Sequence, residues 1–90
     1  MKITKEFVES KIVDEHYWHV PGTTFTLCVL IPENNIPQVG ESACADPAEF
    51  NAEAGRVAAR NKALGKVWDA YGTILKNKIY EDSVNGEAEA

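Results

Sequence analysis

Residues 40–50 read Gly-Glu-Ser-Ala-Cys-Ala-Asp-Pro-Ala-Glu-Phe, and within this stretch the apolar pattern changes from the period of a strand to that of a helix. Asp46 is followed directly by a proline and, three residues later, by Glu49, a combination typical of a capped helix start. The stretch therefore predicts sheet before it and one long helix that begins at Asp46.

Three segments before this junction alternate between apolar and polar residues, as strands do. They cover residues 14–20, 24–31 and 36–43. The segment 24–31 is apolar on both faces towards its end, which predicts a central strand or a subunit contact. Pro21 and Gly22 favour a type II turn after the first segment. Before the strands, Thr4 predicts a short N-capped helix.

The long helix carries an apolar stripe whose members are spaced alternately four and three residues apart, as in a heptad pattern. The stripe consists of Phe50, Ala54, Val57, Asn61, Leu64, Trp68, Tyr71 and Leu75. Two interpretations stay open: the stripe packs across the sheet, or it forms a helix–helix seam in a dimer. Small residues leave the other faces nearly smooth, namely Ala52, Gly55, Ala58, Ala59, Ala63 and Gly65. Gly72 predicts a bend or break in the helix near residues 69–72.

Together these patterns predict an α+β fold, a three-stranded antiparallel β-meander packed by one long C-terminal helix, with a short N-terminal helix. Residues 1–80 are expected to form a single domain. Residues 81–90 are polar and acidic and lack an apolar face, so they are predicted to be a disordered tail.

Charge is distributed unevenly over the 90 residues, whose net charge is −5. Residues 1–55 contain three lysines and nine carboxylates, whereas residues 56–78 contain six basic side chains and one carboxylate, Asp69. This pattern argues against a uniformly acidic DNA mimic and against a protein that binds duplex nucleic acid. The chain has no leader-like segment and no apolar run near the roughly 18 residues that a bilayer requires. We therefore expect no membrane partner and a location in the cytoplasm of a host cell.

Three motifs carry a resemblance to a known family. They are Pro-Gly-Thr-Thr at residues 21–24, Gly-Glu-Ser-Ala-Cys at 40–44 and Phe-x-x-Glu-x-Gly-Arg at 50–56. The chain resembles, over about residues 14–76, a family of small proteins encoded by tailed bacteriophages and prophages. The function of that family is unknown, so the resemblance implies a phage setting and no active site. The chain departs from the family pattern after Trp68 and in a longer loop at residues 32–37.

Candidate reactive groups are few. Ser42 lies at a strand-to-helix junction, but the motif lacks the final glycine of a nucleophile elbow. His16 and His19 fall on opposite faces of a strand, which disfavours a zinc site with Cys28 and Cys44. We expect both cysteines to be buried small hydrophobic residues. The sequence thus predicts no catalytic residues, no metal and no cofactor, and hence a protein that is not an enzyme.

A possible ligand site comes from the helix and the first strand. Arginines four residues apart share a helix face and match phosphate oxygens, and aromatic rings stack on bases. The candidate ligand-binding residues are Arg56, Arg60, Asn61, Trp18, Tyr17 and His19. The alternative is structural: the arginines pair with Glu53, Glu49 or a carboxylate of the sheet, and Trp18 belongs to the core.

The sequence favours a non-enzymatic phage accessory protein for host takeover or anti-defence that acts by binding. In one mechanism a homo-oligomer, formed through the smooth helix faces or the segment 24–31, sequesters a small nucleotide-like signal. In another the protein is an inhibitor that docks directly on a host protein. A structural or interaction module without a small ligand is the third possibility, and a minor enzyme of nucleotide metabolism lacks an acid–base set.

Overall fold

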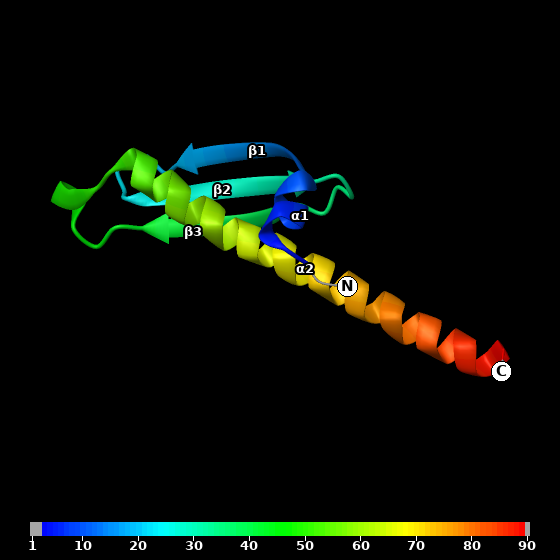
Figure 1. The fold of residues 1–90 in the computed structure, drawn as a ribbon. Helices are drawn as coiled ribbons and strands as arrows, with labels where there is room; N and C mark the ends of the chain where they lie inside the picture. The colour runs from blue at the N-terminus through cyan, green and yellow to red at the C-terminus, as the bar shows by residue number, and fades with distance from the viewer. Residues whose placement is uncertain (1–2, 90) are drawn as a thin grey trace.

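Three strands and three helical segments make up residues 3–89, which the computed structural model describes, with side chains described as far as Asn85. Their order is α1 (Lys5–Ser10), β1 (Ile12–His19), β2 (Phe25–Pro32), β3 (Gln38–Ala43), the 3-10 turn η1 (Pro47–Glu49) and α2 (Ala52–Glu89). The strands form one antiparallel sheet in the order β1-β2-β3. This arrangement confirms the predicted meander with a long C-terminal and a short N-terminal helix (Figure 1).

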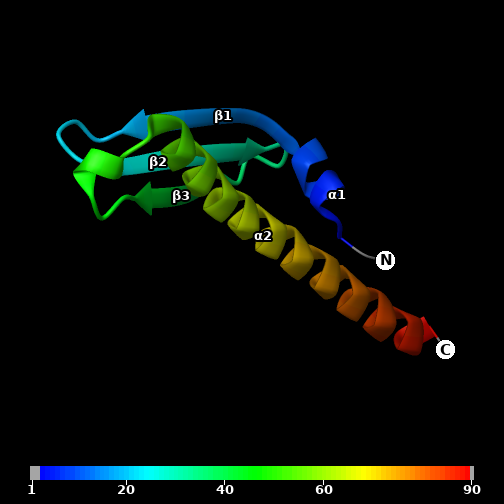
Figure 2. The same ribbon diagram turned by 60° about the vertical axis from the view of Figure 1, so that its left-hand side comes forward.

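Both α-helices lie on the same side of the sheet, and α2 crosses it obliquely before extending well beyond it (Figures 1 and 2). The molecule is elongated, with dimensions of 65 × 22 × 19 Å. Because side chains alternate between the faces of a strand, β2 turns Cys28 and Leu30 towards α2, where both are buried. The residues that alternate with the buried ones along β2, namely Phe25, Leu27, Val29 and Ile31, face the opposite side, and no described helix or strand covers that side.

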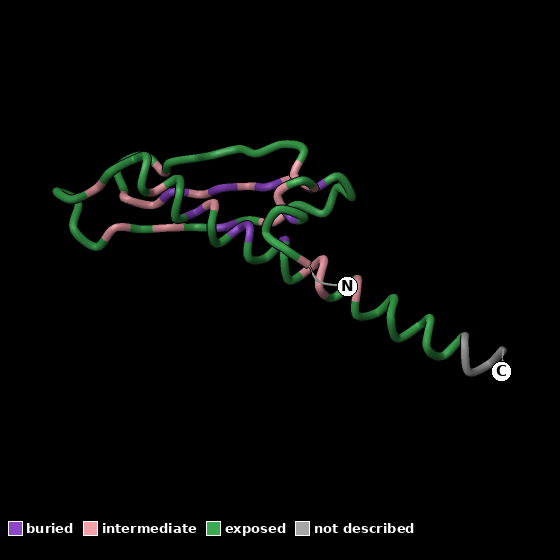
Figure 3. Tube along the Cα trace, in the orientation of Figure 1, coloured by how far each residue is buried: buried purple, intermediate pink, exposed green. Residues whose placement is uncertain are grey.

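The core lies between β2, α1 and the first half of α2 (Figure 3). Its buried apolar members are Val8, Cys28, Leu30, Ala59, Ala63, Leu64 and Val67. Gly40 of β3 lies directly beneath the helix: a Cβ atom there would collide with the backbone of Ala59 and Ala63. The alanine face of α2 and Gly40 together let the helix approach β3 closely.

The predicted heptad stripe is therefore not the face that packs on the sheet. Of its members, Leu64 is buried, whereas Val57 is 51% exposed and Trp68 is 37% exposed. Asn61 is exposed as well. The alanine face, predicted to be free for an oligomer contact, is partly used within the chain because alanines fit above Gly40 and larger side chains do not.

The predicted start of the long helix at Asp46 is wrong. The Asp46 side chain accepts a hydrogen bond from the amide of Ala48 at 3.0 Å, but it caps only η1. Phe50 then returns to an extended conformation, and α2 begins at Ala52, with the Asn51 side chain accepting from the amide of Ala54 at 3.1 Å. The capping signature therefore serves a single turn, and Phe50, where the chain becomes extended, stacks on His19.

The predicted break near Gly72 is also absent, since α2 continues without interruption to Glu89. The segment 81–89 is thus helical in the structure, where the sequence indicated a disordered tail. The described side chains of residues 81–85 are all exposed. Residue 90 lies outside the described residues, and the division into a domain of residues 1–80 and a tail stays a prediction.

Several local predictions are confirmed. Thr4 caps α1 by accepting from the amide of Phe7 at 3.1 Å. Gly22 has a φ of 77°, as the second central residue of a type II turn requires. Both cysteines are free; Cys28 is buried as expected, whereas Cys44 is half-buried, so the prediction of two buried cysteines holds only for Cys28. None of the helices within the described part of the chain could serve as a membrane span.

Candidate functional site

Three of the six predicted ligand-binding residues come together. Tyr17, His19 and Arg56 line a small cavity between β1 and the start of α2, with Thr26 and Ala52 completing its wall. The cavity has a volume of about 130 Å³. Small-molecule sites usually measure about 300 Å³ or more, so this cavity by itself is too small for a nucleotide.

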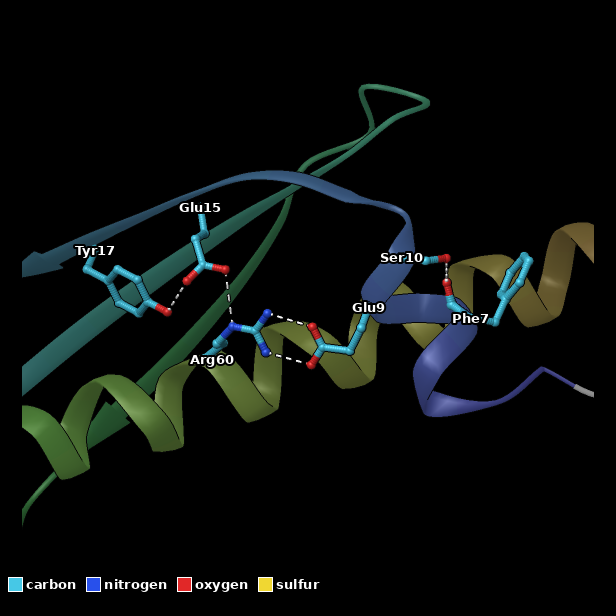
Figure 4. Close-up of polar contacts among 6 residues, drawn as sticks. All are labelled: Phe7, Glu9, Ser10, Glu15, Tyr17 and Arg60. Atoms are coloured by element: carbon cyan, nitrogen blue, oxygen red, sulfur yellow. Dashed lines mark hydrogen bonds and ion pairs between the residues drawn. The ribbon is translucent and has the colours of Figure 1, made fainter.

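Arg60 lies beside this cavity, but its guanidinium group is engaged in ion pairs (Figure 4). Its two terminal nitrogens donate to the two carboxylate oxygens of Glu9, each at 2.8 Å, and its Nε donates to Glu15 at 3.3 Å. Tyr17 donates its hydroxyl hydrogen to the other oxygen of Glu15 at 2.8 Å. The hydrogen bonds from Arg60 hold the pKa of Glu9 below its ordinary value.

The pairing of Arg60 with Glu15 is the structural alternative that the sequence left open, a carboxylate of the sheet. Glu9 was missed, although a bidentate carboxylate is the partner that a partly buried arginine favours. The sequence does show that Glu9 lies in the last turn of a short helix. It does not show that this helix, α1, lies next to α2, so the contact could not be predicted. The cluster joins α1, β1 and α2 at one point, so its first role is to hold these elements together.

Arg56 also has a carboxylate partner, as the same alternative proposed: it donates to Glu53 at 2.9 Å. Its side chain is 44% exposed and that of Glu53 is 77% exposed, so this pair contributes little to stability. His19 stacks on Phe50 with ring centroids 4.9 Å apart. Burial and then the bond to Glu15 raise the pKa of Tyr17 far above its ordinary value, which keeps the hydroxyl neutral.

Trp18 and Asn61 lie elsewhere. Trp18 is 58% exposed, so it is not a core residue, and it points to the side of the sheet opposite Tyr17 because adjacent strand residues alternate. Asn61 follows Arg60 directly, which turns it about 100° around the helix. The structure thus brings Tyr17, His19 and Arg56 to one cavity and leaves the other three outside it, and their role in ligand binding stays a prediction.

The three motifs of the family resemblance meet one another at the junction of sheet and helix. Thr24 donates its hydroxyl hydrogen to the carbonyl oxygen of Cys44 at 2.6 Å, and the amide of Cys44 lies 3.1 Å from the same hydroxyl. Ser42 donates to the carbonyl oxygen of Gly55 at 2.7 Å. With Gly40 beneath the alanine face, these contacts explain the motifs as a structural junction.

This junction explains the position of Ser42, the residue considered as a nucleophile. The Ser42 hydroxyl is occupied by a backbone carbonyl, and the Cys44 thiol donates to the carbonyl oxygen of Asp46 at 3.2 Å. Within the residues that the structure describes, no three histidine, cysteine, aspartate or glutamate side chains gather closely enough to hold a metal ion.

The uncovered side of the sheet is an apolar feature of the described surface, and we call it the open sheet face. It consists of Trp18, Phe25, Leu27, Val29, Ile31 and Val39, placed in cross-strand rows by the register of the three strands. Trp18 pairs with Leu27, and Val29 pairs with Val39. Val39 is 41% exposed, and the four β2 residues are half-buried among their neighbours.

Acidic groups flank this face on both edge strands. Asp14 stands on β1 opposite Ile31, and Glu41 stands on β3 opposite Leu27. His16 lies on β1 between Asp14 and Trp18, with its Nε2 3.0 Å from a carboxylate oxygen of Asp14. The face is therefore an apolar centre with a carboxylate at each side.

Comparison with known proteins identifies the family. A model described as the phage protein (N4 Gp49/phage Sf6 gene 66) family matches residues 3–79. No curated protein matches the chain. No solved structure matches it either. The match covers the sheet, the junction motifs and most of α2, and the chain accordingly belongs to the phage protein (N4 Gp49/phage Sf6 gene 66) family.

Proposed function

We propose that this phage protein is a non-enzymatic accessory protein that acts by binding a host protein through its open sheet face. The observation that supports the proposal is that α1 and α2 cover one side of the sheet and leave the apolar other side to solvent. Antiparallel sheets commonly expose one face to water, but that face is then polar. Here Leu27, Val29 and Ile31 occupy its centre.

The chemistry of the face specifies the kind of partner. A contiguous apolar patch with a polar rim is typical of a protein-binding surface. Asp14 and Glu41 make the rim acidic, and residues 1–55 as a whole carry nine carboxylates against three lysines. A partner with an apolar patch between basic side chains complements this charge. A second copy of the same face would bring like charges together, which favours a different protein.

A smaller second proposal concerns the cavity between β1 and α2. The Thr26 side-chain oxygen is buried and finds no hydrogen-bond partner among the described residues, and Thr26 is one of the residues that line this cavity with Arg56. A buried hydroxyl normally has a partner. We propose a small anionic group, such as a phosphate, as the occupant, and a nucleotide-sized signal would need a second copy to complete the site.

Site-specific photo-crosslinking in host cells tests the first proposal. A photoreactive phenylalanine derivative replaces Trp18, and a matched control carries it at Tyr80, an aromatic side chain that is 65% exposed on α2. We expect a host-protein adduct from position 18 and none from position 80. The same host-protein adduct from both positions, or only self-adducts from position 18, would contradict the proposal.

Once the adduct identifies the host protein, its binding is tested with a variant of the open sheet face. Val39→Lys places a positive charge on the open sheet face at an edge strand, where the native side chain is already 41% exposed. We expect this variant to lose binding to the purified partner and to melt close to the parent. Retention of binding would remove the open sheet face as the contact surface.

The anion proposal has its own test. Calorimetric titration with inorganic phosphate and with linear and cyclic nucleotides is expected to give binding in the parent and none in Arg56→Ala. Absence of binding in the parent overturns the cavity as a ligand site and leaves the protein-binding proposal unaffected.

A further inference from the structure

A side of α2 that does not pack on the sheet carries a second surface, separate from the open sheet face, with Leu75 half-buried at its border beside α1. Residues there recur at alternating spacings of four and three, so they form one stripe along the helix. The stripe, which we call the outer α2 stripe, consists of Asn61, Gly65, Trp68, Gly72, Leu75 and Ile79. Trp68 is 37% exposed and Ile79 is 56% exposed.

The two glycines of this stripe have no explanation within one chain. A Cβ atom at Gly65 or at Gly72 would meet nothing within 4 Å. Glycine in a helix interior is less favourable than alanine. By contrast, Gly55 and Gly40 each face close neighbours. A second helix that approaches closely at Gly65 and Gly72 would supply the missing reason.

The length of α2 also favours a second helix packed against the outer α2 stripe. The helix spans 38 residues, and its C-terminal part, orange to red in Figure 1, projects beyond the sheet and α1. Most helical stability in proteins comes from packing an apolar face. Ile79 lies in the projecting part with its side chain exposed.

Charged residues beside the stripe indicate which partner binds there and in which direction its helix runs. Asp69 and Lys76 are both exposed and seven residues apart, so they lie on one flank of the stripe within about 20° of each other. In an antiparallel pair of α2 helices whose two-fold axis is level with residues 72 and 73, Asp69 of one copy lies level with Lys76 of the other. In a parallel pair the like charges would meet.

The side chains of the stripe are complementary in the same antiparallel register. Trp68 of one copy falls level with the gap between Leu75 and Ile79 of the other, and the two Gly72 residues lie nearest the axis. Large side chains thus meet apolar ones, Gly72 lies where the helices cross most closely, and Gly65 lies level with the large Tyr80 side chain of the other copy. We propose that the outer α2 stripe binds a second copy of this chain in an antiparallel helix pair, with reciprocal Asp69–Lys76 ion pairs.

Charge reversal tests this arrangement by sedimentation equilibrium at low salt. The parent is expected to show a concentration-dependent dimer. Asp69→Lys and Lys76→Asp each replace two attractive contacts by two repulsive ones and should raise the dissociation constant about tenfold or more. The double variant D69K/K76D restores unlike pairs and should return it to within about threefold of the parent.

A matched control uses Glu81→Lys, which changes the charge equally on the opposite side of the helix and should leave dimerisation unchanged. Circular dichroism of every variant in dilute solution checks that the helix is intact. A parent that stays monomeric at the highest concentration reached, or a double variant as weak as the single ones, would overturn the proposal. This test is independent of the open sheet face and of any host partner.

Discussion

Replacing Gly40 by alanine is the sharpest test of how α2 meets the sheet. The added Cβ would collide with the carbonyl oxygen of Ala59 and the amide nitrogen of Ala63, and it would lie 2.9 Å from the Cα of Ala63. All three are backbone atoms of a helix, so no side-chain rotation relieves the collision. The helix must move away from β3 and loosen the packing of two fully buried alanines.

Overpacking of a well-packed core costs typically about 1–3 kcal/mol, and we expect the upper end here because only the backbone can yield. A loss of about 3 kcal/mol in a domain of this size lowers the melting temperature by about 12–24 °C. Since small domains have a free energy of unfolding of about 5–15 kcal/mol, Gly40→Ala is expected to remain folded at low temperature.

Thermal unfolding followed by circular dichroism measures this effect in dilute solution. Gly65→Ala is the matched control, because its Cβ would meet nothing within 4 Å. Alanine is the better helix former by about 1 kcal/mol, so this variant should melt higher than the parent. If Gly40→Ala melts within about 4 °C of the parent, the close approach of α2 to β3 is wrong.

Three further predictions concern the core, the ion-pair cluster and the end of α2. Leu64→Glu, at a side chain only 5% exposed, should cost about 4 kcal/mol through lost burial and a stranded charge, and an unchanged urea midpoint would contradict this. Because the folded-state pKa of Glu9 lies below its ordinary 4.5, the cluster stabilises the fold above pH 4.5 and loses that contribution as the pH falls through the folded pKa. The free energy of unfolding of Arg60→Met should therefore fall furthest below that of the parent near neutral pH, and this difference should shrink in acid. Arg56→Met should unfold much like the parent. Urea titrations across pH would refute this if the difference between Arg60→Met and the parent did not depend on pH. Deletion of residues 81–90 should leave the melting temperature of the dilute protein almost unchanged, since residues 81–85 are exposed, and a large fall would show that the segment packs.

Much of the fold could be predicted from the sequence because its signals are local. Strand alternation, the turn at Gly22 and the cap at Thr4 each depend on a few neighbouring residues, and each is found. The helix start failed because the capping signature of Asp46 fits a single turn as well as a long helix. The break at Gly72 failed because a helical glycine is a cost and not a prohibition.

The packing face of α2 could not be predicted, since it depends on a contact between distant residues. Periodicity reveals an apolar stripe but not which surface covers it. The decisive residue is Gly40, whose missing side chain admits Ala59 and Ala63, whereas Trp68 stays 37% exposed. Similarly, the spacing of Arg56 and Arg60 indicated a shared helix face, while their carboxylate partners include Glu9 on another element.

The central claim is that the open sheet face is uncovered, acidic at its rim and free to bind. Trp68→Phe leaves Trp18 as the single tryptophan, placed on that face, and its fluorescence quenching reports the surroundings directly. We predict an emission typical of an exposed indole at every concentration and stronger quenching by caesium than by iodide, because Asp14 and Glu41 attract cations. Emission typical of a buried indole in dilute solution, protected from both quenchers, would show that the face is already covered and would contradict the claim.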